Sequence, residues 1–142
     1  MTNLPLDGIR IADFSQVVAG PYATLFMAQM GAEVIKIETA SREPMEQRTA
    51  GAFSNLNGSK KSITLNLKDP RGVTLAKNLV KVSHIVVENF ATGVMERFGL
   101  GYDELRKVKP DIIMLSNQAL GRSGPLKDAP GYGPQMIAFA GL

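Results

Sequence analysis

Residues 8–38 read GIRIADFSQVVAGPYATLFMAQMGAEVIKIE, and this stretch decides the fold. Its opening, GIRIADF, is a short β-branched apolar run of the kind that forms strands. Residues 20–31 have helical spacing, with Pro21 suited to the first turn and Gly31 to a C-terminal stop. A second β-branched run follows at 32–38. The stretch therefore predicts a strand, a turn, a helix and a second strand.

The rest of the chain continues this alternation of strand-like and helix-like segments. Further strands are predicted over 61–67, 84–89 and 111–118, and further helices over 69–82, 91–98 and 102–108. Strands that alternate with helices favour a mostly parallel sheet. The fold class is therefore α/β: a Rossmann-like open, mostly parallel sheet with helices on both faces.

Two segments carry more specific expectations. Residues 39–60 are rich in Ser, Gly and Asn and are predicted to be one long polar loop. Asp69 is a suitable N-cap for the helix that follows it. That helix is expected to place four apolar residues roughly on one face: Val73, Leu75, Leu79 and Val82.

Composition narrows the classes of function. The chain of 142 residues is 44% hydrophobic, which suits one globular domain or part of one, and its net charge of +3 is too small for a nucleic-acid footprint. It contains no cysteine, and His84 is its single histidine, so no His- or Cys-based metal site is expected. No signal peptide or membrane span is evident in the sequence, so a cytoplasmic protein without a membrane partner is expected.

In an open parallel sheet, ligands bind at the carboxyl ends of the strands. The turn SQVVAGP, residues 15–21, has small residues at the start of a helix, where backbone N–H groups bind anions. Lys68 and Arg97 follow later strands and could pair with phosphate, and Phe90 could stack on a base. The alternatives are an ordinary tight turn, solvated charges and a core aromatic residue.

A dinucleotide-binding domain is one candidate, because a strand, a turn and a helix are followed by a strand that ends in the acidic Glu38. The turn lacks the G-x-G-x-x-G pattern, however, since Gly20 stands alone and Pro21 follows it directly. This candidate is therefore the weakest of those considered.

Several motifs, taken in order, resemble one family along the whole chain. They are residues 5–38, the segment NGSKKSITLNLKDPRG, the segment VVENFATGVMERFGLGYDELRKVKPDIIMLS and the turn GRSGPLKDAPGYG. Together they resemble the family III CoA-transferases, which include formyl-CoA transferase, carnitine-CoA transferase and alpha-methylacyl-CoA racemase. The resemblance implies a homodimer of interlocked chains whose Rossmann-like domain binds CoA or an acyl-CoA. The partners it implies are an acyl-CoA and a carboxylic acid.

The resemblance also implies which residues contact CoA. By position these are Gln16, Val17, Val18, Ala19, Leu65, Lys68, Asn89, Phe90 and Arg97. Family members are two to three times as long as this chain. Residues 1–142 are therefore expected to be an incomplete, N-terminal CoA-binding domain.

The last segment, PGYGPQMIAFAGL at 130–142, raises the question of the catalytic group. The resemblance aligns Gly133 with the aspartate that attacks the donor thioester in the transferases, and Tyr132 with the histidine base of the racemase. A glycine has no nucleophile, and a tyrosine hydroxyl is a poor base at neutral pH. Four interpretations stay open: a transferase with a variant catalytic group, a catalytically silent CoA-binding module or half of a tandem transferase, a racemase-like enzyme, and, as the remote alternative, a dinucleotide-binding domain.

Overall fold

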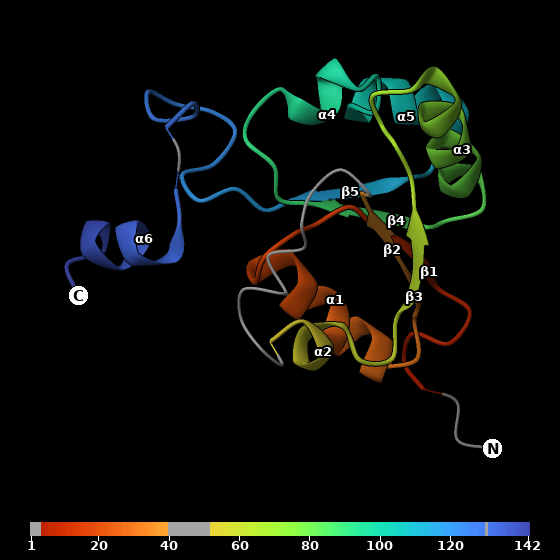
Figure 1. The fold of residues 1–142 in the computed structure, drawn as a ribbon, viewed down its shortest axis with the longest axis horizontal. Helices are drawn as coiled ribbons and strands as arrows, with labels where there is room; N and C mark the ends of the chain where they lie inside the picture. Colours follow the sequence, from red (N-terminus) through yellow and green to blue (C-terminus); the bar gives the residue numbers. More distant parts are fainter. Residues whose placement is uncertain (1–3, 40–51, 130) are drawn as a thin grey trace.

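A single five-stranded parallel sheet organises the fold. The computed structural model describes residues 4–39, 52–129 and 131–142 (Figure 1). The strands lie in the order β3-β2-β1-β4-β5, and every neighbouring pair is parallel. Their bounds are β1 Arg10–Asp13, β2 Glu33–Glu38, β3 Lys61–Thr64, β4 Ile85–Glu88 and β5 Ile113–Ser116. The order confirms the predicted Rossmann-like class, because the chain runs outward from β1 in both directions.

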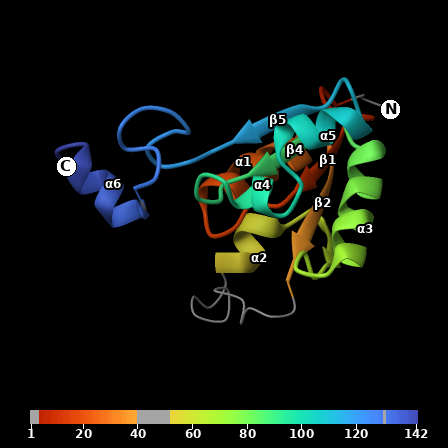
Figure 2. The ribbon, with the colours of Figure 1, turned by 90° about the horizontal axis from the view of Figure 1, so that it is seen from above.

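Helices cover both faces of this sheet. Their bounds are α1 Ala19–Gln29, α2 Ala52–Asn57, α3 Pro70–Lys81, α4 Val94–Arg97, α5 Tyr102–Val108 and α6 Gly133–Phe139. Figure 1 shows α3, α4 and α5 on one face and α1 and α2 on the other. The second view shows α6 projecting away from the sheet at the end of a long connection (Figure 2).

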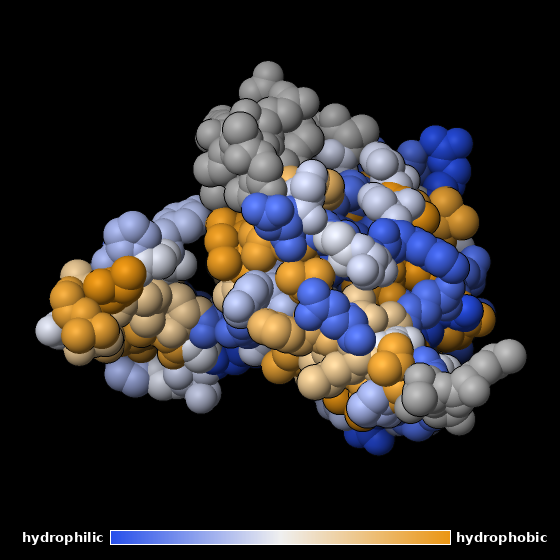
Figure 3. All heavy atoms as spheres, turned by 90° about the horizontal axis from the view of Figure 1, so that it is seen from below, coloured by the Kyte–Doolittle hydropathy of each residue, from blue (hydrophilic) through white to orange (hydrophobic). Residues whose placement is uncertain are grey.

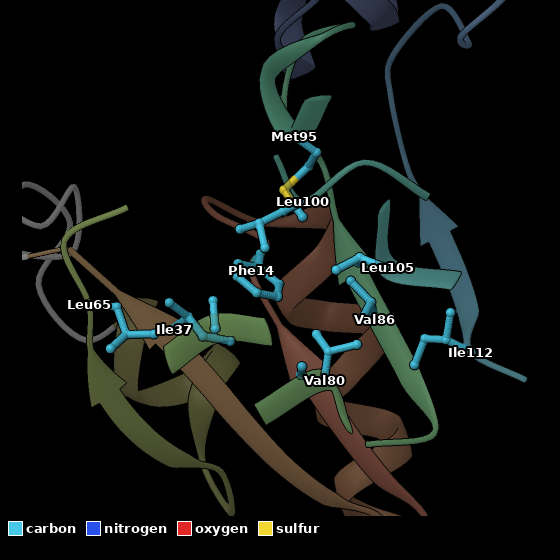
Figure 4. Packing of buried hydrophobic residues seen from close by; sticks show 11 residues of the cluster. Phe14, Ile37, Leu65, Val80, Val86, Met95, Leu100, Leu105 and Ile112 are labelled. Carbon is cyan, nitrogen blue, oxygen red and sulfur yellow. The ribbon is translucent and has the colours of Figure 1, made fainter. Parts of the chain in front are cut away.

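Alternation along the strands divides the apolar core between the two faces. Ala12 of β1 belongs to the larger cluster, with Val86 of β4 and residues of α3, α4 and α5. Figure 4 shows Val80, Met95 and Leu105 of these helices converging on the sheet. The neighbouring Ile11 belongs to a second cluster on the α1 face. This is the pattern of a parallel sheet buried on both sides.

Local sequence signals set several helix ends. The Asp69 side chain accepts a hydrogen bond from the Arg71 N–H at 2.9 Å, so it caps α3 as predicted. Gly31, after α1, has φ of +104°, which favours glycine. The expected apolar face of α3 is wrong in part, because Leu75 and Val82 are more than half exposed while Ala76 and Val80 are buried. The helix is rotated so that small residues face the sheet.

The predicted loop over 39–60 is also corrected in part. Residues 52–57 form α2, which contacts α1, and residues 40–51 lie outside the described part. The predicted helix over 91–98 is shorter and covers only α4. Within the described ranges, no helix is long and apolar enough to span a bilayer.

Candidate functional site

The carboxyl ends of β1 and β4 form the switch point of the sheet. From there the chain enters α1 on one face and α4 on the other. The two turns are joined directly: the Gln16 N–H donates to Asn89 Oδ1, and Asn89 Nδ2 donates to the Gln16 carbonyl, each at 2.7 Å. Ligands bind at such a point in open α/β sheets. The Asn89 amide is thus used to hold the first turn in place.

The first turn has an uncommon backbone conformation. Val17 has φ of +67°, in the region that favours glycine, although it is β-branched. Such conformations cost about 1–3 kcal/mol and cluster at ligand sites. Asn89 forms two hydrogen bonds with Gln16, the residue before Val17, and these bonds help to maintain the strained conformation. Val17 and Val18, in the turn between β1 and α1, are 41% and 55% exposed.

The start of α1 lies unusually close to the strand that precedes it. A Cβ atom added at Gly20 would lie 2.2 Å from the Ser15 Cβ, so a larger residue does not fit there. No described side chain caps α1, which begins at Ala19. Helix N-termini carry N–H groups without intrahelical partners and attract anions. This close approach places those groups beside the end of β1.

A buried network of polar side chains holds the first turn in place. The Asp13 side chain is fully buried, and its Oδ1 accepts from the Ser15 N–H at 2.9 Å and from the Ser15 hydroxyl. Its Oδ2 accepts from Thr24 Oγ1 at 2.6 Å and lies 3.3 Å from Lys60 Nζ. Lys36, also buried, donates to the Ser15 carbonyl at 2.8 Å. Strands β1 and β2 and helix α1 are thereby fixed relative to the turn.

Lys60 ties α2 to this network. Its side chain is 1% exposed, and Nζ donates to the Pro21 carbonyl at 2.8 Å, to Thr24 Oγ1 at 2.7 Å and to Asn57 Oδ1 at 2.9 Å. Burial lowers the pKa of Lys60, and the charge of Asp13 acts in the opposite direction. The sequence gives no local signal for this pair, because Asp13 and Lys60 are 47 positions apart and meet only in the fold. Neither residue is among those that the sequence predicts for the site.

The residues predicted after β3 divide into a buried one and an exposed one. Leu65 is 8% exposed and belongs to the core, so its side chain faces away from solvent. Lys68 is exposed, and its N–H donates to Asn66 Oδ1 at 3.1 Å in the turn before α3. β3 lies two strands from β1 in the sheet, at the same carboxyl edge. Lys68 therefore shares the edge of the sheet with the switch point.

The residues predicted after β4 lie on the other side of the switch point. Phe90 is half-buried and packs against the larger core cluster. Its N–H donates to Glu88 Oε2 at 2.8 Å. Arg97, the last residue of α4, is exposed, and its guanidinium reaches back toward Gly93 at the start of the helix. Phe90 is thus partly exposed beside the switch point, and Arg97 offers a cation.

The segment predicted to carry catalysis is exposed and lies apart from these turns, in the part that projects at the left of Figures 2 and 3. Gly133 is the first residue of α6, and an added Cβ would meet no atom within 4 Å. Tyr132 is 63% exposed, and its N–H donates to Gln135 Oε1 at 2.9 Å. The φ angle of Gly133 is not positive, so its backbone does not require glycine. In the described ranges no three His, Cys, Asp or Glu residues lie close enough together to hold a metal ion.

Strand order and the paired turns define the class: an open α/β domain whose first and fourth strands end in two turns joined at the switch point. The sequence model of CoA-transferase family III matches residues 6–142. The chain belongs to this family. The predicted recognition is thus confirmed, and the dinucleotide-binding candidate is set aside.

Relatives and solved structures agree with this assignment. The chain is 40% identical over 146 residues to succinyl-CoA:glutarate CoA-transferase of Mus musculus, covering 97% of this chain and 34% of that protein. It is 36% identical over 146 residues to acetyl-CoA:oxalate CoA-transferase of Acetobacter aceti, covering 97% and 37%. Rv3272 of Mycobacterium tuberculosis superposes with a TM-score of 0.92 at 39% identity, covering 97% of this chain and 40% of that one. The chain thus spans about a third of the length of the curated relatives it matches.

Proposed function

We propose that this chain is the CoA-binding part of a CoA-transferase, which moves CoA between an acyl-CoA thioester and a carboxylic acid. The observation that carries the proposal is the pairing of Gln16 with Asn89 at the switch point, in a chain that belongs to CoA-transferase family III. The named relatives use succinyl-CoA or acetyl-CoA with a carboxylic acid. The homodimer and the cytoplasmic location remain predictions.

The geometry supports a division of labour among the predicted contacts. Residues 17–19, in the first turn and at the uncapped start of α1, are exposed and can receive an anionic or amide group of CoA. Lys68 and Arg97 supply charges for phosphate groups, and the half-buried Phe90 supplies a ring face. Asn89 acts by holding the first turn, and Leu65 can contribute only through its backbone.

Replacing Lys68 or Arg97 by alanine is expected to weaken CoA binding by about 1.5–3 kcal/mol each, because a charge-assisted hydrogen bond to phosphate is lost. Isothermal titration calorimetry with CoA measures this change. Lys81→Ala is the matched control, since Lys81 is exposed at the opposite end of α3 and loses the same charge. Variants at Lys68 and Arg97 that bind CoA as tightly as Lys81→Ala would disprove the assignment.

The transfer reaction needs a carboxylate that attacks the thioester carbon and displaces the CoA thiolate. Gly133 and Tyr132 supply none, and α6 contains no acidic residue. Because the chain spans about a third of its relatives, we place this carboxylate in another part of the whole protein. The second candidate is a CoA-binding module without catalytic activity.

Incubation of the whole protein with acyl-CoA is expected to leave the peptide Gly131–Leu142 unmodified. The reason is that no carboxylate oxygen is available there to form the acyl-enzyme bond. Peptide mass spectrometry with and without hydroxylamine measures the adduct. An adduct on another peptide supports the transferase, and none anywhere supports the silent module. A hydroxylamine-sensitive adduct on 131–142 would contradict the expectation.

A further inference from the structure

Arg122, in the segment after β5, contacts three separate parts of the fold. Its Nη1 donates to Ser116 Oγ at 2.8 Å, and its Nη2 forms an ion pair with the Glu96 carboxylate. Nη1 also lies 3.6 Å from Oε1 of Glu88. One guanidinium thus joins the end of β5, helix α4 and the end of β4.

Glu88 needs this arginine. The residue is 1% exposed, and its Oε1 has no hydrogen-bond partner among the described residues. A buried carboxylate without a compensating charge is strongly unfavourable. Arg122 supplies that charge. The other oxygen of Glu88, Oε2, accepts from the Phe90 N–H and so sets the turn after β4.

The segment that carries Arg122 is held against the same turn by two further contacts. Thr92 Oγ1 donates to the Lys127 carbonyl at 2.6 Å. The Asn117 N–H donates to the Glu88 carbonyl at 2.9 Å. Residues 117–127 and the turn between β4 and α4 are therefore connected at several points, with Arg122 as the charged one.

We propose that Arg122 is a positioning residue for the CoA site. It holds the backbone at Phe90 in place through Glu88, and through Glu96 it holds helix α4, which carries Arg97. Two carboxylates and a hydroxyl already engage its guanidinium, so it acts on the site without pairing with phosphate itself. This inference rests on the proposed CoA function.

CoA titration of Arg122→Gln tests the inference. The expected result is an increase in the Kd for CoA of about ten-fold, because coupled neighbours are displaced together. Arg122→Lys keeps the positive charge but loses the planar guanidinium that reaches both Glu88 and Glu96. This variant should therefore give a smaller increase in the Kd. Arg106→Gln is the matched control, because Arg106 is exposed on α5 beside Tyr102 and should leave the Kd unchanged. All titrations are made at a temperature where circular dichroism shows each variant folded.

A double variant separates positioning from a general loss of structure. If Arg122 acts partly through Glu96, then Arg122→Gln combined with Glu96→Gln should raise the Kd by less than the product of the two single effects. Effects that multiply independently would overturn the route through α4. Unchanged CoA affinity in Arg122→Gln would overturn the whole inference.

A second readout does not depend on CoA. Release of the segment after β5 should speed the cleavage by endoproteinase Lys-C after Lys127 in Arg122→Gln relative to Arg106→Gln. Faster cleavage with an unchanged Kd would show that Arg122 only anchors the segment, which contradicts positioning of the site. A parent protein that binds no CoA would instead overturn the proposed function, and the inference with it.

Discussion

Replacing Asp13 by alanine is expected to lower the free energy of unfolding by about 3–5 kcal/mol, because it leaves a buried ammonium group without its counter-charge. The partner is Lys60, whose side chain is 1% exposed and lies 3.3 Å from Asp13 Oδ2. Thr24 and Ser15 lose their acceptor in the same step. Urea denaturation followed by circular dichroism measures the change.

An exposed pair of the same type provides the control for Asp13→Ala. Asp111 lies 2.9 Å from Lys109, but its side chain is 75% exposed. Asp111→Ala should change stability by about 1 kcal/mol or less, since water screens that pair. The double variant Asp13→Leu with Lys60→Met should recover part of the loss, because it removes both buried charges. A cost for Asp13→Ala no greater than that of Asp111→Ala would contradict the role of the network.

Gly72→Ala is expected to destabilise the protein by about 3 kcal/mol, at the upper end of the usual cost of overpacking. The added Cβ would lie 2.0 Å from the carbonyl oxygen of Asn66 and 2.7 Å from its carbonyl carbon. Both are backbone atoms, so α3 or the turn before it must move. That turn carries Lys68, so the displacement should also weaken CoA binding. Thermal and urea denaturation measure the first effect, and calorimetry the second.

Helix propensity alone predicts that Gly72→Ala stabilises the protein, so the observed sign of the change in stability tests the steric argument. Alanine is favoured over glycine inside helices by about 1 kcal/mol. Gly133→Ala makes the same substitution in the first turn of α6, where the new Cβ meets no atom within 4 Å, and should change stability by about 0.5 kcal/mol or less. A Gly72→Ala variant as stable as Gly133→Ala would show that the close approach of α3 to Asn66 is not needed.

The sequence predicts a place for the candidate site because that place follows from the strand endings. Gln16, Asn89 and Lys68 each come just after a strand, and parallel strands bring their carboxyl ends to one edge. Their roles as CoA contacts stay predictions. The hydrogen bonds between Asn89 and Gln16 could not be predicted, because they depend on β4 lying next to β1.

The sequence by itself determined the five strands, most of the helices and the family to which the chain belongs. Helix α5, at Tyr102–Val108, lies where the pattern predicts it, and the Asp69 cap and Gly31 stop act through residues only a few positions away. Such signals are local, so the sequence displays them directly. The strand periodicity is equally local.

Only the tertiary structure decided how the turns are supported. Lys60 reaches Asp13 across 47 positions of sequence, and Arg122 reaches Glu96 across 26. Gly72 shows no special pattern, yet the path of the preceding turn leaves no room for a Cβ there. The two ion pairs depend on which distant segments pack together, and the Gly72 contact depends on how the turn from Asn66 folds back on α3. Burial makes each of these features costly to change. A buried charge that loses its partner cannot reach water, and an added methyl group finds no free space in a packed interior.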